Sequence, residues 1–376
     1  MAKVKKLKDS GPLSAIGLMS GTSMDGIDAA WVETDGEADV GFGDALMVPY
    51  AADFRARLHR FISSVPEKNH PDVAKIESEL TDLHAAAVRR LITQAGRTPD
   101  VIGFHGQTVW HRPHLGQTWQ IGDGERLAHA LKVPVVFDFR ANDVKHGGQG
   151  APLLPLFHSK LVAMHSKPVV VANIGGVANI TWLGEARVKK KPSQFPFEIL
   201  GFDTGPGNAL IDDWMLKHTG ETMDRNGKAA REGQVDQARL KKLLAAPFFS
   251  QPPPKSLDRL AFDPRIVDGL NTNDGAATLV EFTAATITKA IAMCPSPPEQ
   301  LLVTGGGRHN PVLMERIAAL TGIPTDPVEA VGCNGDVIEA QAFGYFAVRA
   351  LRDLPLTYPE LTGAPTPLVG GRLASV

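Results

Sequence analysis

Apolar and polar positions along the chain follow the spacings of strands and helices in turn. An apolar run over residues 15–19 is followed by a polar stretch bounded by glycines and a second run over 27–32, which predicts a β-hairpin. From Pro71 to Gly96, apolar residues recur at spacings of three and four, so we expect an amphipathic helix with the proline in its first turn. Its apolar positions are Val73, Ile76, Leu80, Leu83, Ala87 and Leu91.

The alternation of strand and helix continues through the first half of the chain. Short apolar runs at 101–104 and 133–137 flank a helical pattern near 125–131, which indicates α/β structure. Residues 147–152 are rich in glycine and proline, and we place a crossing between two lobes there.

The second half has the same character. Predicted strands cover 168–172, 178–183, 199–202 and 300–304, and predicted helices cover 207–217, 276–293, 310–320 and 336–351. We expect the last helix to return the chain to the first lobe. The proline-rich stretch 248–264 has little periodicity and has two interpretations, an ordered loop near a site or a plain surface loop.

The length of the chain supports this division. Single hydrophobic cores stop growing at roughly 250–300 residues, so 376 residues predict two domains. Apolar residues make up 43% and charged residues 21%, as in ordinary globular proteins. We assign residues 1–147 and 345–376 to the first lobe and 148–344 to the second.

Charge and cysteine content exclude several classes of partner. A net charge of -2 offers no cationic surface for nucleic acid or an anionic membrane. No apolar stretch has the length of a membrane span, and none follows the amino terminus as in a signal peptide, so a cytoplasmic location is expected. We interpret Cys294 and Cys333 as structural thiols, because two cysteines cannot form a disulfide framework.

Three glycine-rich turns, at 21–28, 173–179 and 304–311, follow or connect predicted strands. Glycine permits a close approach of the backbone to phosphate, and N–H and hydroxyl groups donate to its oxygens. The third turn also enters a helix, whose dipole favours an anion. Alone, each could be an ordinary turn; together they predict a phosphate chain bound from two sides.

The sequence contains no G-x-x-x-x-G-K-[ST], H-E-x-x-H or G-x-S-x-G motif, which argues against a P-loop kinase, a zincin and a serine hydrolase.

Asp203 follows a predicted strand within the glycine-rich segment 201–208. It could be an N-cap or turn aspartate, but the flanking glycines and the three turns favour a carboxylate at the edge of a cleft.

Polar side chains also follow strands of the first lobe. Segment 105–111 supplies donors and an aromatic surface suited to a polyhydroxyl ligand, or else is a polar loop with one core tryptophan. Arg140 could clamp a carboxylate through its planar guanidinium, or pair with Asp143. Glu339 stands in the first turn of a predicted helix, where the helix dipole also favours a surface glutamate.

Six segments, taken in order, closely resemble the anhydro-N-acetylmuramic acid kinase family over nearly the whole chain. They are 21–28, 105–111, 138–143, 201–208, 305–311 and 335–343. The resemblance implies the two-lobed α/β, actin-like ATPase fold of the sugar kinase, heat-shock-protein and actin superfamily, with ATP in a central cleft. It also implies conversion of 1,6-anhydro-N-acetylmuramic acid and water to N-acetylmuramic acid 6-phosphate in peptidoglycan recycling. From the resemblance we further expect a homodimer.

The resemblance assigns roles by position. Asp203 would be the general base. The ATP-binding residues would be Gly21, Thr22, Ser23, Met24, Asp25, Gly26, Ile27, Asp28, Gly175, Gly176, Gly305, Gly306, Gly307 and Asn310. The sugar-binding residues would be His105, Gln107, Thr108, Arg140 and Glu339. Mg²⁺ would accompany ATP; its ligands stay open, with Asp25 a candidate through a water molecule.

One segment departs from the family pattern, since Lys255–Arg259 lacks the Ser-Thr-Gly-Arg sequence usual after the proline-lysine step.

Three alternative functions also stay open: a kinase for another anhydrosugar or a hexose, a chaperone-like ATPase of the same fold, and a non-catalytic sugar sensor. A carboxylate contact of Arg140 would disfavour the first, and the three turns disfavour the sensor.

Overall fold

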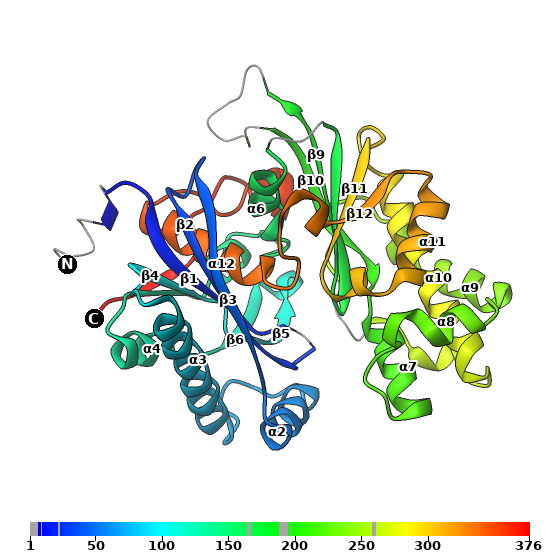
Figure 1. The fold of residues 1–376 in the computed structure, drawn as a ribbon, viewed down its shortest axis with the longest axis horizontal. Coiled ribbons are helices and arrows are strands. Elements are labelled where there is room, and N and C mark those ends of the chain that lie inside the picture. Colours follow the sequence, from blue (N-terminus) through cyan, green and yellow to red (C-terminus); the bar gives the residue numbers. More distant parts are fainter. Residues whose placement is uncertain are drawn as a thin grey trace. The chain divides into compact units, whose positions relative to one another are not determined.

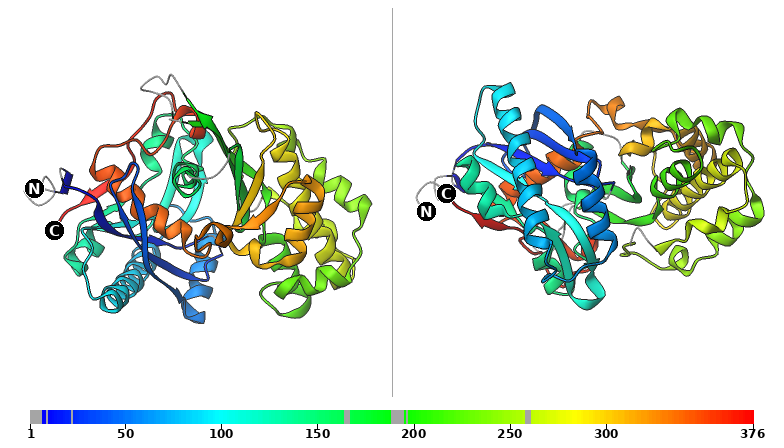
Figure 2. Two further views of the ribbon diagram at one scale, coloured as in Figure 1. Left: turned by 45° about the horizontal axis from the view of Figure 1, so that its top comes forward. Right: turned by 90° about the horizontal axis from the view of Figure 1, so that it is seen from below.

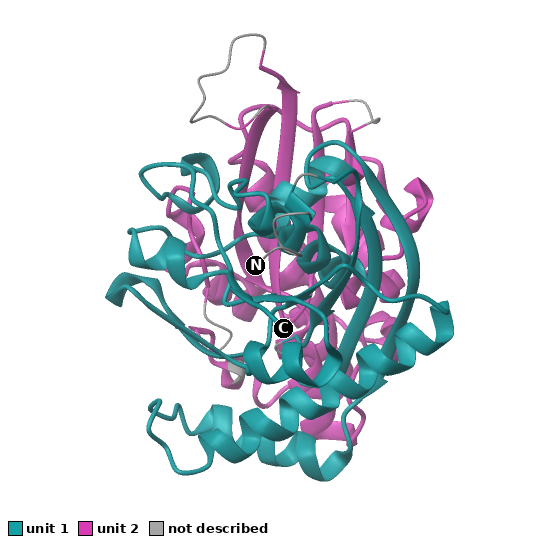
Figure 3. Cartoon of the chain, turned by 90° about the vertical axis from the view of Figure 1, so that its left-hand side faces the viewer, with its two compact units in different colours: residues 1–160, 337–376 teal, residues 161–336 magenta. Residues whose placement is uncertain are grey.

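The computed structural model describes residues 7–8, 10–21, 23–163, 167–187, 195, 197–257 and 261–376. The chain divides into two compact units (Figure 3). Unit 1 comprises residues 1–160 and 337–376, and unit 2 comprises 161–336. Each has its own sheet and its own hydrophobic core. The predicted α/β architecture in two parts is therefore confirmed.

Unit 1 is built on a six-stranded sheet in the order β13-β7-β4-β1-β2-β3 (Figure 1). Its strands are β1 (Leu13–Met19), β2 (Gly26–Thr34), β3 (Val40–Pro49), β4 (Val101–Phe104), β7 (Val135–Phe137) and β13 (Arg372–Ala374). Strands β1, β4 and β7 are parallel, and β1 and β2 form the predicted hairpin. A separate hairpin joins β5 (Gln107–Arg112) and β6 (Gln117–Ile121).

Helices cover both faces of this sheet. The helices of unit 1 are α2 (Ala52–Ser63), α3 (Val73–Ala95), α4 (Gly124–Leu131), α5 (Ala141–Lys145), α6 (Leu154–Leu161), α12 (Ile338–Leu351) and α13 (Pro359–Thr362). Figure 2 shows the ribbons of α3 and α12 on opposite sides of the β1–β2 strands. Ile16 and Leu18 of β1 belong to the core that includes α3, while Gly17 between them faces α12. A Cβ atom on Gly17 would lie 1.7 Å from the Ala340 carbonyl oxygen, so only glycine allows α12 to pack this closely.

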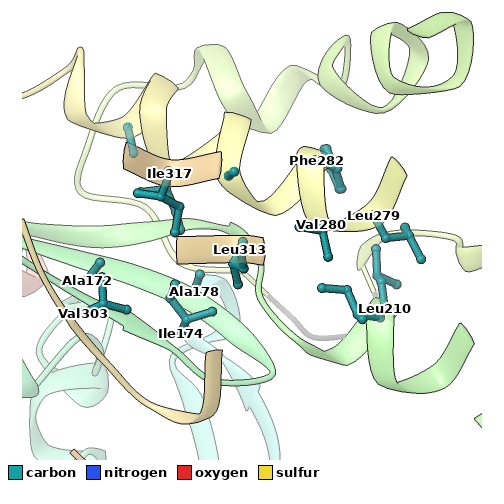
Figure 4. Close-up of a cluster of buried hydrophobic side chains, with 14 of the residues drawn as sticks. Ala172, Ile174, Ala178, Leu210, Leu279, Val280, Phe282, Val303, Leu313 and Ile317 are labelled. Carbon is teal, nitrogen blue, oxygen red and sulfur yellow. The ribbon is translucent and has the colours of Figure 1, made fainter. Parts of the chain in front are cut away.

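Unit 2 is built on a five-stranded sheet in the order β10-β9-β8-β11-β12. Its strands are β8 (Val169–Ile174), β9 (Val177–Ala186), β10 (Phe197–Pro206), β11 (Gln300–Thr304) and β12 (Thr325–Pro327). Its helices are α7 (Ala209–Thr219), α8 (Lys228–Glu232), α9 (Gln237–Leu244), α10 (Thr272–Ile291) and α11 (Pro311–Thr321). Figure 4 shows part of its core, where Leu313 and Ile317 of α11 lie with Ile174 and Val303 of the sheet.

Short 3-10 turns connect several elements in both units. They are η1 (Pro113–Leu115), η2 (Arg225–Gly227), η3 (Pro247–Ser250), η5 (Pro264–Val267), η6 (Gly306–His309) and η7 (Val328–Val331). Within the described residues, no helix combines the length and apolar character needed to cross a membrane.

The bounds of the units differ from those of the predicted lobes. The first crossing follows residue 160 rather than 147, because Phe157 of α6 packs against Phe42 and Tyr345 of unit 1. The chain returns at Val337 rather than at 345, because all of α12 lies on the unit 1 sheet.

Sequence patterns also missed β3, α2 and the β5–β6 hairpin. Strand β3 contains two glycines and exposes Phe42 and Met47, so its apolar positions do not alternate as in a half-buried strand.

Candidate functional site

The predicted site residues of unit 2 lie at or after the ends of three strands that point the same way. Strand β9 is antiparallel to both β8 and β10, and β11 is parallel to β8. The carboxyl ends of β8, β10 and β11 therefore meet at one edge of the sheet, which is where α/β proteins place ligands. This edge carries the two glycine turns after β8 and β11, together with the end of β10 that contains Asp203.

The turn after β8 is bonded to the segment that follows β10. The amides of Gly207 and Asn208 donate to the carbonyl oxygens of Gly176 and Gly175, at 2.9 and 2.7 Å. A Cβ atom on Gly207 would lie 2.2 Å from the Gly175 oxygen, so this close approach requires glycine. The predicted residues Gly175 and Gly176 are thus held beside the Asp203 strand.

The turn after β11 packs against the end of β8. Gly305 has a φ of 76°, and a Cβ atom there would lie 2.5 Å from Asn173 Oδ1. A Cβ atom on Gly307 would lie 2.4 Å from Ile174 Cγ2. At Gly306 and Gly175, by contrast, no such atom comes closer than 3.4 Å and 3.6 Å. Gly305 and Gly307 therefore bring the turns together, whereas Gly306 and Gly175 leave backbone surface for a ligand.

Arg308 holds the third turn in place, a role that no sequence pattern indicated. Its buried guanidinium donates to the Gly305 carbonyl oxygen at 2.9 Å and to Glu329 at 2.9 Å. It also forms an ion pair with Asp336 at 2.7 Å. Predicted residue Asn310 caps α11, since its Oδ1 accepts hydrogen bonds from the amides of Val312 and Leu313.

Asp203 lies within β10, opposite Asn179 of β9, and is 9% exposed. Its amide donates to the Lys255 carbonyl oxygen at 3.0 Å, and its Oδ2 accepts a hydrogen bond from the Leu257 amide at 2.7 Å. Asp203 is not an N-cap, because α7 begins after Asn208. The proline-rich stretch therefore contacts Asp203 through Lys255 and Leu257; Asp258 and Arg259 of the departing segment lie outside the described residues.

Amide side chains extend this polar row across the sheet. Asn173 pairs with Asn179 and Asn179 with Asp203, so all three side chains project from the same face. Asn179 Oδ1 is buried and has no hydrogen-bond partner in the described part of the chain. Neither amide was predicted as a site residue, although both stand within the second turn motif.

The predicted site residues of unit 1 likewise follow parallel strands. The first turn follows β1, His105 follows β4, and Arg140 comes shortly after β7, so all three share one sheet edge. Asp138, directly after β7, has a left-handed φ of 58°, and burial raises the pKa of its carboxyl group.

Buried side chains hold the first turn. The Tyr50 hydroxyl donates to Ser20 Oγ at 2.8 Å, and Ser20 Oγ donates to Gln107 Oε1 at 2.7 Å. Gln107 Nε2 then donates to the Gly21 carbonyl oxygen at 3.2 Å. Gln107, predicted to contact sugar, is 1% exposed and supports the turn; Tyr50 was missed, because a single tyrosine beyond the motif carries no signal.

The segment 21–28 contains both turn and strand residues. Met24 donates its amide to the Gly21 carbonyl oxygen and has a φ of 51°, and Ser23 Oγ donates to Asp25 Oδ1 at 2.8 Å. Gly26, Ile27 and Asp28 belong to β2, and Ile27 is buried in the core. The predicted Thr22 lies outside the described residues.

Arg140 and His105 contact each other directly. Arg140 Nε donates to His105 Nε2 at 3.2 Å, and Arg140 NH1 donates to the Gly150 carbonyl oxygen at 2.9 Å. The Asp143 carboxylate accepts hydrogen bonds from the Gly150 amide and from Thr362 Oγ1.

The two other predicted sugar-binding residues lie in the same unit. Thr108, in β5, accepts a hydrogen bond from Gln120 at 3.3 Å. Glu339 lies in the first turn of α12 and is partly exposed. No group of three metal-ligating side chains occurs among the residues that the structure describes.

The sequence comparisons with known proteins agree with one another. A family model described as anhydro-N-acetylmuramic acid kinase matches residues 13–375. A protein of that name from Acidiphilium cryptum is 51% identical over 366 residues, which cover 96% of this chain and 98% of the relative. Another from Rhodospirillum rubrum is 50% identical over 364 residues, which cover 97% of this chain and 95% of the relative. A ligand-bound xylulose kinase structure from Lactobacillus acidophilus covers 90% of this chain and 89% of its own, at 10% identity and a TM-score of 0.45.

Proposed function

This chain belongs to the anhydro-N-acetylmuramic acid kinase family, as its ordered motifs predicted, and we propose that it uses ATP and water to convert 1,6-anhydro-N-acetylmuramic acid to N-acetylmuramic acid 6-phosphate. The observation that carries the proposal is the meeting of Asp203 and two glycine turns at one edge of the unit 2 sheet. We place the reaction in peptidoglycan recycling in the cytoplasm, and we infer a homodimer from the family.

The glycine turns of unit 2 suit the phosphates of a nucleotide. Phosphate binding needs backbone amides without side chains in front of them, and the open surfaces at Gly175 and Gly306 meet that need. In unit 1, the backbone amides of Gly21 and Ser23 would add donors, while Met24 closes the turn. Mg²⁺ keeps several water ligands and binds only one or two carboxylates beside the phosphates. The exposed Asp25 could therefore bind Mg²⁺ through a water molecule. When bound, Mg-ATP supplies the phosphoryl group.

Asp203 would act as the general base. The anhydro bridge occupies one face of C1, so water attacks from the opposite face and gives its proton to the Asp203 carboxylate. The C1–O6 bond breaks with its electron pair on O6, which becomes the phosphoryl acceptor. The Leu257 amide, bonded to Oδ2, orients the carboxylate for this step.

The sugar would be bound by residues of unit 1. Arg140 is held by His105 and the Gly150 carbonyl oxygen, and its planar guanidinium suits the lactyl carboxylate of a muramic acid. A hexose has no such carboxylate, so this contact favours the muramic substrate. Thr108 and Glu339 would contact sugar hydroxyls, while buried Gln107 would act through the first turn.

The test is the fate of the water oxygen. The protein is incubated with 1,6-anhydro-N-acetylmuramic acid and ATP in oxygen-18 water, and the product is examined by mass spectrometry. We expect one label at C1 of a ring-opened sugar phosphate, formed in equal amount to ADP. ADP release without sugar would instead indicate an ATPase, and a phosphorylated sugar without the label would exclude the coupled bridge opening.

A further inference from the structure

Lys255 is a buried lysine next to the proposed base. Lys255 is 6% exposed, and its Nζ donates a hydrogen bond to the Phe248 carbonyl oxygen at 3.0 Å. The ammonium group also lies 4.6 Å from the centre of the Phe248 ring and 5.5 Å from that of Phe202. Lysine is almost never fully buried without a partner, so this position needs an explanation beyond packing.

The backbone around Lys255 holds Asp203 at two points. The Lys255 carbonyl oxygen accepts the hydrogen bond from the Asp203 amide, and the Leu257 amide donates to Asp203 Oδ2. The side chain of Lys255 ties the same segment to Phe248 of η3. The buried ammonium group of Lys255 thus anchors the segment that contacts the Asp203 carboxylate.

We propose that Lys255 is a positioning residue for Asp203, which it serves by anchoring segment 255–257 and by placing a positive charge near the carboxylate. The inference rests on the proposed function, in which Asp203 is the base. It accounts for a lysine where an apolar residue would fill the same space at a lower cost of burial.

Electrostatics agree with this geometry. Burial lowers the pKa of Lys255, and the Asp203 carboxylate acts in the opposite direction. Among the described residues, Asp203 is the one charged group that influences the pKa of Lys255. By reciprocity, the ammonium charge favours the ionised form of Asp203, which is the form a general base requires.

A double-mutant cycle tests the proposal, with Lys255→Met, Asp203→Asn and the variant carrying both. Displacement of a catalytic group by about 1 Å costs roughly 10²-fold in rate, so Lys255→Met should lower kcat by about that factor. KM for sugar and for ATP should change by less than about threefold, because binding groups stay in place. Asp203→Asn should lower kcat by roughly 10²–10⁴-fold, and adding Lys255→Met should cause no further loss.

Two further variants separate anchoring from charge. Lys255→Gln keeps a donor for the Phe248 oxygen but no charge, so it should recover part of kcat. In both neutral variants, the acidic limb of the kcat pH profile should move to higher pH, because the ionised Asp203 carboxylate is less favoured without the nearby cation. Lys242→Met, the same substitution at an exposed lysine of α9, should leave kcat and the profile unchanged.

The possible outcomes are distinct. An unchanged kcat in Lys255→Met, or losses that multiply in the double variant, would overturn the proposed role of Lys255. Neither result would affect the role of Asp203 as the base. Near-normal turnover of Asp203→Asn would instead remove Asp203 as the base, whatever Lys255 does. If Lys255→Met fails to fold, Lys255→Gln decides the question through its kcat and pH profile.

Discussion

His105 is a residue whose protonation is set by its surroundings. Burial lowers the pKa of its imidazole well below the ordinary value, and the neighbouring Arg140 guanidinium lowers it further. The ring is therefore neutral, and since Arg140 donates to Nε2, the ring proton is on Nδ1 and is donated to the Gly106 carbonyl oxygen at 2.9 Å. Both nitrogens are engaged, so we expect His105 to act on the sugar mainly by orienting Arg140.

The role of Arg140 leads to a prediction about substrate selectivity. Hydrogen bonds to a charged group contribute about 1.5–3 kcal/mol, so Arg140→Ala should raise KM for the muramic substrate by roughly 10- to 100-fold. Arg140→Lys should restore little, because an ammonium group cannot form the bidentate contact. The control is an analogue without the lactyl group, whose KM should barely change; equal losses on both sugars would contradict a carboxylate contact.

We expect the buried His84 of α3 to make the protein less stable in mild acid. Burial lowers its pKa from 6.5 to about 4, while Nδ1 donates to the Leu80 carbonyl oxygen. The folded state keeps His84 neutral and the unfolded chain takes up a proton. Stability is thus complete above pH 6.5 and is lost as pH falls toward 4. Protonation of this residue in the unfolded chain should lower the unfolding free energy by about 2 kcal/mol as the pH falls from 7 to 5.

Urea unfolding of matched variants measures this contribution. His84→Gln should show an unfolding free energy that falls by about 2 kcal/mol less between pH 7 and pH 5 than that of the unmodified protein. His129→Gln changes an exposed histidine of α4 and should keep the full decrease. Identical pH dependence in the two variants would show that His84 is not the titrating group.

At the scale of elements, the turn after β11 separates structural from ligand-binding glycines. Gly306 has room for a side chain, whereas Gly305 and Gly307 do not. Gly306→Val should therefore fold normally yet bind ATP at least about tenfold more weakly, because its side chain would occupy the space of a phosphate. Calorimetry with ATP measures the affinity, and Gly11→Val, in an open position away from the turns, is the control. Unchanged affinity would remove this turn from the nucleotide site.

At the scale of the whole molecule, two chain crossings join the units, after residue 160 and after residue 336. The proposed reaction assigns sugar contacts to unit 1 and the base to unit 2. We therefore predict that the lobes close when both ligands bind. Small-angle X-ray scattering should show a smaller radius of gyration with sugar plus a non-hydrolysable ATP analogue than without ligands, and an unchanged profile would contradict closure.

The sequence by itself determined the local elements and the family. Periodicity predicted β4 and α3 to within two residues, because period and glycine or proline boundaries are local properties. Ordered motifs predicted the family, since each keeps its residues and spacing along the chain. Among the elements that periodicity missed is β3, whose exposed apolar residues depend on pairing with β2 rather than on local pattern.

Only the tertiary structure decided which side chains support the site and where the units divide. Tyr50 reaches Ser20, Arg308 reaches Glu329, and the Lys255 backbone reaches Asp203 through contacts between segments distant in the sequence, which no spacing encodes. The return to unit 1 at Val337 likewise depends on α12 packing against Gly17, more than 300 residues earlier in the chain. Local pattern specifies what a segment can form, whereas burial and partners arise only when distant segments pack together.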